Sequence, residues 1–190
     1  CNCIIMRKFR DLTQRLGNTM QNTWFDTFKT GWGWMAILTS EKGIRRISLP
    51  QKTKRESLEI LGINPVVMTC SSRNLDQIIY SIQQYFLGNP IKINMPLDFS
   101  RYPTFFTKAW ISCLKIPFGE KRSYGWIAMQ SGNPRAARAA GQAMARNPFP
   151  IIVPCHRVIL GNGSLHQYGG GLAMKSKLLD MEKDISSTSF

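Results

Sequence analysis

The first half of the chain alternates short apolar and polar runs in a pattern that predicts strands. Three runs rich in aromatic and β-branched residues cover 24–30, 34–39 and 44–49, and turn signals containing glycine separate them. Short strands joined by tight turns predict a small antiparallel sheet. Residues 1–20 carry polar and basic side chains around a few apolar ones, which predicts either a short amphipathic helix or a loose terminal arm.

Helical spacing follows the sheet. Residues 54–61 predict a short helix. Residues 75–87 predict a longer one, whose apolar side chains share one face before a Gly-Asn-Pro sequence ends it. An extended, proline-punctuated stretch comes next and is the expected boundary between two domains, which we place at 1–98 and 99–190.

The second half of the chain is predominantly helical. A helix over 105–114 is followed by one that Ser123 can cap. A further helix is expected to begin at Asn133, with Pro134 at its first position, and to run to Arg146. Two short helices joined by a tight turn with glycine are typical of a helix-turn-helix.

The last of these helices has mostly small side chains between its arginines. Its backbone can therefore come close to a flat or grooved partner, while Arg135, Arg138 and Arg146 supply positive charge. Alanine also favours helix formation and close packing against a neighbouring helix. This pattern alone leaves both interpretations open.

The charge balance favours a polyanionic partner. The chain has 25 Lys and Arg against 11 Asp and Glu, a formal charge of +14, and each basic group placed on a phosphate releases counterions. RNA or an anionic membrane surface would fit this charge equally well. Because no apolar run approaches the roughly 20 residues of a spanning helix, and the start of the chain lacks a leader pattern, we expect a soluble, intracellular protein.

The five cysteines do not predict a disulfide framework, because their number is odd and their spacing irregular. A metal site built from Cys1, Cys3 and Cys70 is disfavoured, since the chain has only two histidines and no paired C-x-x-C. We therefore expect no bound metal.

One cysteine stands in a segment suited to chemistry. Pro148, Pro150 and Pro154 stiffen the approach to Cys155, and a thiol becomes a strong nucleophile only as the thiolate. His156 is the obvious base. Adjacent side chains on a strand point to opposite faces, so a bridging water and an orienting carboxylate would be needed. By itself this pair is weak support for catalysis, because buried cysteines are common and usually inert.

The sequence Asn-Pro-Phe-Pro, followed by Pro-Cys-His-Arg-Val around Cys155, resembles the active-site signature of the O6-alkylguanine-DNA alkyltransferases, also called methylated-DNA–protein-cysteine methyltransferases. Similar motifs lie on both sides in the same order: 116–125, 132–141 and 168–182. The similarity runs from about 103 to 182, with a weaker echo at Gly33-Trp34 and in the 40–46 hairpin.

This resemblance implies a DNA-repair enzyme, a methylated-DNA–[protein]-cysteine S-methyltransferase that acts once. Cys155 would take the alkyl group irreversibly from O6-alkylguanine in double-stranded DNA, without a cofactor, and alkylated thymine is left open as a substrate. The implied fold is α/β (α+β), with an RNase H-like amino-terminal domain and a winged-helix-like carboxyl-terminal domain. We expect a monomer that is not membrane-bound, in the cytoplasm on the nucleoid, or in the nucleus of a eukaryote.

The resemblance also implies roles for residues around Cys155. His156 matches the base that takes the thiol proton through a water, and Glu182 the carboxylate that holds the imidazole, although sequence alone favours a solvated helix residue for Glu182. Asn147 matches the residue that braces the turn. Tyr124 matches the donor to the departing guanine. The zinc ligands of some relatives have no evident match.

Arg138 matches the family's arginine finger, which fills the gap left by the extruded nucleotide while the helix lies in the minor groove. The residues implied to contact DNA are Tyr124, Arg135, Ala137, Arg138, Ala139 and Gly141. Those implied to receive the guanine are Met144, Pro150, Val158, Tyr168, Gly169 and Gly170. Gly169 stands where many relatives have serine, so a backbone N–H must replace the hydroxyl contact to O6. We expect Arg157 to be a structural ion-pair partner.

Two alternatives come from other classes of protein. A damage-sensing DNA-binding module would lack the acceptor cysteine, whereas Cys155 is present. A helix-turn-helix transcription regulator would bind DNA without any transfer. A gain in protein mass after incubation with alkylated DNA is expected only for the transferase.

Overall fold

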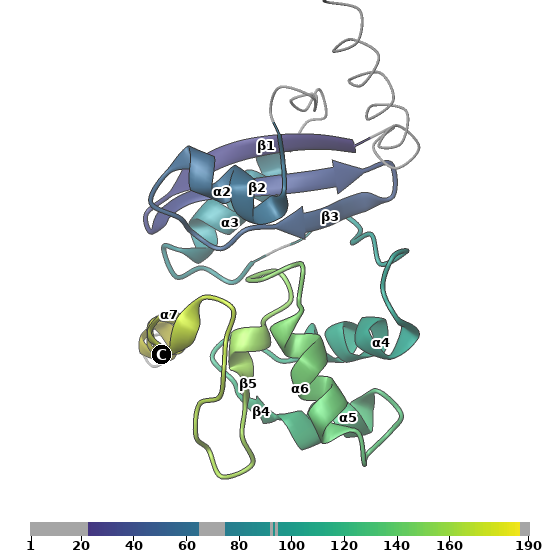
Figure 1. The fold of residues 1–190 in the computed structure, drawn as a ribbon. Helices are drawn as coiled ribbons and strands as arrows, with labels where there is room; N and C mark the ends of the chain where they lie inside the picture. The colour runs from purple at the N-terminus through teal and green to yellow at the C-terminus, as the bar shows by residue number, and fades with distance from the viewer. Residues whose placement is uncertain (1–22, 65–74, 92, 94, 187–190) are drawn as a thin grey trace, which may run out of the picture.

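The structure is a computed structural model that describes residues 23–64, 75–91, 93 and 95–186. The amino-terminal arm or helix expected at 1–20 lies outside these residues, as do the three cysteines considered as metal ligands. Figure 1 shows the described chain in two parts: a sheet with helices α2 and α3, and beneath it a group of helices that carries the carboxyl-terminal half.

The sheet is the antiparallel meander that the alternating pattern predicts. Its strand order is β1-β2-β3, with bounds Thr23–Thr30, Gly33–Ser40 and Gly43–Ile47. Gly43 begins β3 at φ 127°, and a Cβ there would lie 2.0 Å from the carbonyl oxygen of Pro96. The tight turn and the close approach of the 95–98 segment therefore both require glycine at this position.

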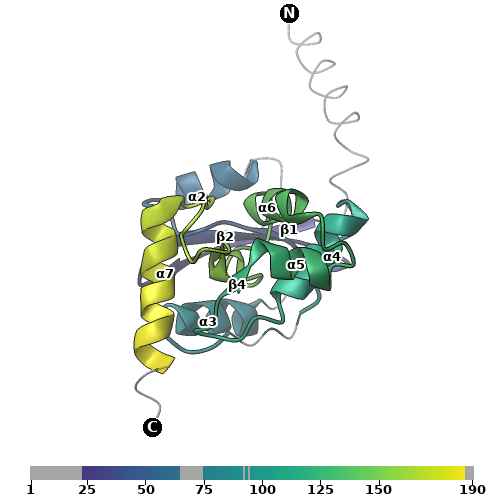
Figure 2. The same ribbon diagram turned by 90° about the horizontal axis from the view of Figure 1, so that it is seen from below.

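Two helices cover opposite faces of this sheet (Figure 2). Helix α2, Lys54–Leu61, has the bounds predicted from the sequence; Thr53 caps it and Gly62 ends it in the left-handed conformation. Helix α3, Asp76–Tyr85, is slightly shorter than predicted. Alternate residues of β2 enter two cores: Ala36 and Leu38 pack with α2, whereas their neighbours join the core shared with α3.

The carboxyl-terminal half contains four helices and a two-stranded parallel ladder. Its helices are α4 (Thr104–Cys113), α5 (Tyr124–Gln130), α6 (Ala137–Ala145) and α7 (Gly171–Ser186). The ladder pairs β4 (Arg122–Ser123) with β5 (Val158–Ile159). Ser123 caps α5 as predicted, since its Oγ accepts a 3.1 Å hydrogen bond from the backbone N–H of Trp126.

The predicted start of the following helix is wrong. Asn133 does accept from the backbone N–H of Arg135 at 3.2 Å, but its carbonyl closes a single turn by accepting from Ala136 at 3.0 Å. Ala136 then leaves the helical conformation at φ −93°, ψ 30°, and α6 begins at Ala137 without a side-chain cap. Asn133 is therefore a capping residue, as predicted, but the turn that it caps is separate from α6.

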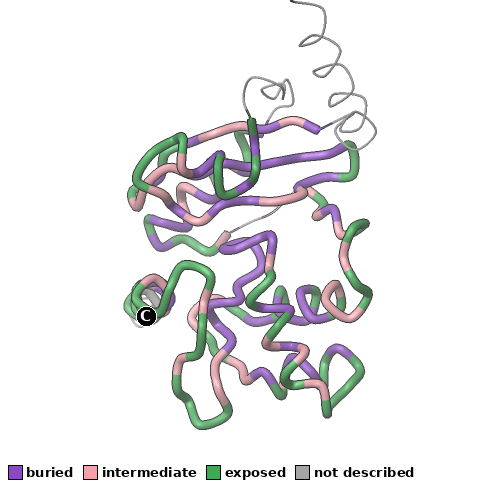
Figure 3. The backbone as a smooth tube through the Cα atoms, viewed as in Figure 1, coloured by how far each residue is buried: buried purple, intermediate pink, exposed green. Residues whose placement is uncertain are grey.

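One hydrophobic core joins the two halves. It includes Ile37 of β2, Ile82 of α3, Trp110 of α4, Met144 of α6 and Leu178 of α7. Figure 3 shows buried backbone both in the strands and in the segment that connects α6 to β5. The boundary at 98/99 stays a prediction. Within the described ranges, no helix is both long and apolar enough to cross a membrane.

Candidate active site

Cys155 lies in a buried turn between α6 and β5. Residues 148–158 are all buried, and Cys155–Arg157 form one turn of 3-10 helix instead of a strand. Successive side chains in such a turn diverge by about 120°, so the thiol and the imidazole of His156 leave the backbone in different directions. Ile151, at φ 72°, is the only described non-glycine residue with a left-handed backbone, which places local strain close to the thiol.

Asn147 fastens this turn. Its Nδ2 donates to the sulfur of Cys155 at 3.0 Å and to the carbonyl of Val153 at 2.9 Å. Its Oδ1 accepts from the backbone N–H of Phe149 at 2.9 Å. One amide group thus joins the end of α6 to the segment that leads into the turn and to its first residue, Cys155, a geometry consistent with the bracing role that the resemblance implies.

His156 is held by a buried carboxylate from α7. Its Nε2 lies 2.8 Å from Oε1 of Glu182, and neither side chain is exposed to solvent. Arg157 donates to both oxygens of Glu182, and the backbone N–H of Gly119 donates to Oε2 at 3.2 Å. The solvated position that sequence alone favours for Glu182 is wrong, because α7 turns this side chain into the core.

Burial, hydrogen bonds and neighbouring charges set the protonation states of Glu182 and His156. Burial alone would raise the pKa of Glu182, but the hydrogen bonds and charges of His156 and Arg157 lower it to about 2. Glu182 is therefore ionised. Burial lowers the pKa of His156, partly offset by Glu182, so the imidazole is neutral.

The thiol of Cys155 is not ionised in advance. Burial raises its pKa to about 11, although the hydrogen bond from Asn147 acts in the opposite direction. Within the described residues, Nδ1 of His156 is buried and has no hydrogen-bond partner. With Nε2 facing Glu182, this atom is free to accept a proton. A neutral thiol and a neutral base with a free lone pair are the elements of general-base activation of a nucleophile.

Two adjoining cavities lie near these groups, although Cys155, His156 and Glu182 line neither. Tyr168, which lines the smaller one, has its ring centroid 6.4 Å from that of His156. The larger, of about 390 Å³, is lined by Tyr124, Ala137, Arg138, Gly141, Gln142, Ala145, Leu160, His166 and Gln167. The smaller, of about 270 Å³, is lined by Ala145, Gln167, Tyr168, Gly169, Gly171 and Leu172. Volumes of a few hundred Å³ suit a small planar molecule. Six of the residues assigned from the sequence line these cavities.

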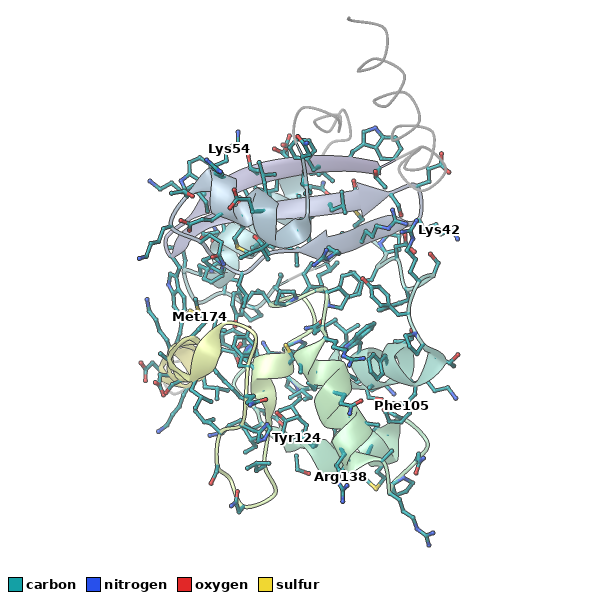
Figure 4. All side chains as sticks on the ribbon, in the orientation of Figure 1. Lys42, Lys54, Phe105, Tyr124, Arg138 and Met174 are labelled. Carbon is teal, nitrogen blue, oxygen red and sulfur yellow. The ribbon has the colours of Figure 1, made fainter. Side chains whose placement is uncertain are left out.

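Figure 4 shows Tyr124 and Arg138 at the same end of the molecule, far from Lys42 in the turn between β2 and β3 and from Lys54 at the start of α2. Arg138 is exposed. Burial, and then the neighbouring Cys155 and Cys113, raise the pKa of Tyr124 to about 12. The Tyr124 hydroxyl therefore keeps its proton and is able to donate it.

Several assigned residues lie outside the cavity walls. Met144, Pro150 and Val158 are buried behind them, while Arg135 is exposed and Ala139 half-buried on the surface around α6. The sequence reasoning did not assign the cavity residues Gln142, Ala145, Leu160, His166, Gln167, Gly171 and Leu172, nor Tyr85, whose hydroxyl contacts Glu182. The only available signal for the cavity residues was their place in the matching segment, and for Tyr85 the periodicity of a core helix.

The two adjacent glycines of the cavity loop differ in the space around them. A Cβ at Gly169 would meet nothing within 4 Å, whereas one at Gly170 would lie 2.8 Å from Cδ1 of Leu49 and 3.0 Å from Cγ of Met174. Gly170 therefore permits a close contact with the end of the sheet. Gly169 leaves open space where a larger side chain would fit.

Lys175 ties this loop to the ladder beneath it. Its ammonium group is buried and donates to the carbonyl of Val158 at 2.6 Å and to that of His166 at 3.3 Å. Burial lowers the pKa of this lysine. Its charge also acts to lower the pKa of the Cys155 thiol.

Comparisons with known proteins identify relatives of this chain. The profile of a family described as "6-O-methylguanine DNA methyltransferase, DNA binding domain" matches residues 104–184. A methylated-DNA–protein-cysteine methyltransferase of Mycobacterium leprae is 48% identical over 107 residues, which are 56% of this chain and 64% of that protein. The chain thus spans somewhat less than two thirds of this relative.

A second relative is matched along nearly its whole length. The constitutive methylated-DNA–protein-cysteine methyltransferase of Bacillus subtilis is 37% identical over 161 residues, covering 84% of this chain and 95% of that protein. The chain belongs to this family.

Solved members of the methylated-DNA–protein-cysteine methyltransferase family share the fold. The O6-methylguanine methyltransferase of Mycobacterium tuberculosis superimposes with a TM-score of 0.68 at 34% identity, covering 85% of this chain and 93% of that one. The structure titled as OGT of the same organism in complex with DNA gives 0.70, again at 34% identity, covering 84% and 92%. The predicted mixed α/β fold with a small antiparallel sheet is therefore confirmed.

Proposed function

We propose that the chain repairs DNA by transferring an alkyl group from O6 of guanine to the sulfur of Cys155. One observation supports this most strongly: the residue after Cys155 is a neutral, buried His156, whose Nε2 faces an ionised Glu182 and whose Nδ1 has no partner among the described residues. Two nearby cavities, of about 390 and 270 Å³, also support it, because volumes of this order suit a ligand the size of a purine.

The reaction is a direct displacement at carbon. The sulfur–carbon bond forms as the carbon–O6 bond breaks, and the electron pair of the broken bond stays with the guanine. The thiol proton passes through a bridging water to Nδ1 of His156, and the hydroxyl of Tyr124 donates toward the departing base. Water does not cleave the resulting thioether at a useful rate, so each molecule acts once and needs no dissociable cofactor.

The substrate is double-stranded DNA with the damaged base rotated out of the stack. A base inside a duplex cannot reach a buried sulfur, and extrusion costs a few kcal/mol. Arg138, which is exposed and lines the larger cavity, would fill the gap. Small residues of α6 let its backbone lie in the minor groove. The charge of +14 and the DNA complex of the Mycobacterium tuberculosis relative support this role.

The proposal extends to the working state of the protein. We propose that it acts as a monomer in the cytoplasm on the nucleoid, or in the nucleus of a eukaryote. O4-alkylthymine is a second substrate to assay.

Intact-mass measurement tests the transfer directly. After incubation with duplex DNA containing O6-methylguanine, the protein should gain the mass of one methylene group, and peptide mapping should place it on Cys155. Cys155→Ser should abolish the gain while DNA binding survives. Cys113→Ser is the matched control, because Cys113 is also a buried free thiol, and it should still be methylated.

The alternatives give different results in the same experiment. Binding to the lesion without any gain in mass would contradict the proposal and indicate a damage-sensing module. Binding that ignores the lesion would indicate a transcription regulator. Transfer at normal stoichiometry in Cys155→Ser would move the acceptor to another residue.

A further inference from the structure

Tyr85 connects the sheet half of the molecule to the reactive group. It is the last residue of α3 and is fully buried. Its hydroxyl lies 2.6 Å from Oε1 of Glu182 and 3.1 Å from Nε2 of His156. These partners lie on α7 and on the turn after Cys155, so the sheet half places a polar group directly against the base and its carboxylate.

The protons around Nε2 can be counted. A tyrosine hydroxyl has one hydrogen, and the ionised Glu182 takes it at 2.6 Å, so toward His156 the oxygen of Tyr85 offers only lone pairs. Oε1 of Glu182 can likewise only accept. Both atoms that face Nε2 are therefore acceptors, which requires a hydrogen on Nε2 and leaves Nδ1 bare.

From this arrangement we infer that Tyr85 is a positioning residue that, together with Glu182, holds His156 in the tautomer able to take the proton of Cys155. The inference rests on the proposed function and deepens it. It assigns the amino-terminal half a part in the reaction, in addition to its share of the core.

Tyr85 supplies a second acceptor for His156, because Glu182 also accepts hydrogen bonds from Arg157. Oε1 also accepts from Nη2 of Arg157 at 2.9 Å, so without Tyr85 a single shared oxygen would hold Nε2. The ring of Tyr85 is fixed separately from its hydroxyl by edge contacts with Phe86 and Phe118, at centroid distances of 5.4 and 6.2 Å. Tyr85→Phe can therefore remove the hydroxyl and leave the ring in place.

Removal of the hydroxyl should also change the pH dependence. The groups acting on His156 are Glu182, Arg157 and Lys175, with the rings of Tyr85 and Tyr168 beside it and Cys155 next in sequence. Without the Tyr85 hydroxyl, Glu182 has one donor fewer and its charge acts more strongly on the imidazole, so the pKa of His156 rises. Because the base must be neutral, the acidic limb of the rate profile should move to higher pH.

The test compares Tyr85→Phe with Tyr102→Phe. Tyr102 is a second interdomain tyrosine whose hydroxyl contacts only the carbonyl of Arg45, at 3.5 Å, among the hydrogen bonds of the described residues. For Tyr85→Phe we expect transfer from O6-methylguanine DNA to be about 10-fold slower at neutral pH, with the acidic limb shifted and DNA affinity unchanged. Tyr102→Phe should keep the wild-type rate and profile.

A second measurement does not depend on activity, and its wild-type part does not depend on the variant folding. The ¹⁵N chemical shifts of His156 in the wild-type protein should show the hydrogen on Nε2, and those of Tyr85→Phe a mixture of tautomers. A wild-type hydrogen on Nδ1, or a Tyr85→Phe protein with the wild-type rate, pH profile and tautomer, would overturn the inference. A wild-type protein with the expected tautomer but no methyl transfer would instead contradict the proposed function.

Discussion

Arg157 and Glu182 form a buried double hydrogen bond, with Nε 2.8 Å from Oε2 and Nη2 2.9 Å from Oε1. The same guanidinium donates to the carbonyl of Ile116 at 2.8 Å. The pair thus joins α7, the turn after Cys155 and the end of α4. It also places the Glu182 carboxylate, whose charge Arg157 balances, against the imidazole of His156 that the proposed reaction uses as a base.

Glu182→Gln should destabilise the protein strongly. The amide leaves the buried Arg157 without a counter-charge, and breaking a buried ion pair in this way typically costs about 3–5 kcal/mol. Urea unfolding measures the loss. Glu59→Gln is the control, because it breaks a surface ion pair with Arg55 and should change the free energy of unfolding little. Equal losses of unfolding free energy in the two variants would show that the buried ion pair stabilises the protein no more than the surface pair does.

The free energy of unfolding should fall in acid as Glu182 becomes protonated. The pKa of Glu182 is lowered in the folded protein from its ordinary 4.5 to about 2, so its contribution is fully present above pH 4.5 and is lost as the pH falls toward 2. Unfolding free energies of the wild type and Glu182→Gln should therefore converge over this range. A difference that stays constant down to pH 2 would show that the ordinary pKa is retained.

Arg138→Ala should separate reaction with DNA from reaction with a free base. Without a side chain to fill the gap in the helix, extrusion is less favourable and transfer from duplex DNA should slow by roughly 10- to 100-fold. Reaction with free O6-alkylguanine should stay near the wild-type rate. Arg55→Ala, which removes an equal charge from α2, is expected to affect neither. Equal losses with both substrates would argue against the finger role.

Cys155 should react slowly with simple electrophiles. Because burial raises the pKa of its thiol to about 11, labelling by iodoacetamide at pH 7 should be far slower than that of a free thiol and should rise about tenfold per pH unit. Peptide mapping across a pH series measures this rate. Rapid labelling at pH 7 that levels off below pH 9 would indicate a thiolate already formed in the resting protein.

The neighbouring glycines of the cavity loop provide a matched pair of variants. Gly169→Ser should leave the melting temperature unchanged, because a Cβ there meets no atom within 4 Å, and its hydroxyl should alter the relative rates with methyl and benzyl adducts. Gly170→Ser should lower the melting temperature, because Leu49 and Met174 must move. Equal melting temperatures for the two variants would contradict the packing described.

Local sequence signals predicted the elements that depend on local interactions. The three strands, helix α2 and the Ser123 cap of α5 rest on periodicity and capping, and all appear in the structure. The predicted start of α6 is wrong because Asn133 caps an isolated turn that ends before Ala137. The reactive cysteine was found from its motif and not from periodicity.

Interactions between distant residues could not be predicted in this way. Tyr85 lies 71 residues from His156 and 97 from Glu182 in the sequence, and helical spacing marks it only as a core residue. Glu182 looks like a solvated residue until the path of α7 is known. The free Nδ1 of His156 likewise follows from the packing of three separate elements.

The contact between Leu49 and Gly170 has a practical consequence for protein engineering. Leu49 lies outside the 104–184 segment that the family profile covers, yet it packs against Gly170, in the loop whose residues Tyr168, Gly169 and Gly171 line the smaller cavity. A library randomised only within that segment would leave Leu49 unchanged. Screens for inhibitor resistance or for acceptance of bulkier adducts should therefore also sample position 49, where a smaller side chain would leave space for the cavity loop to move.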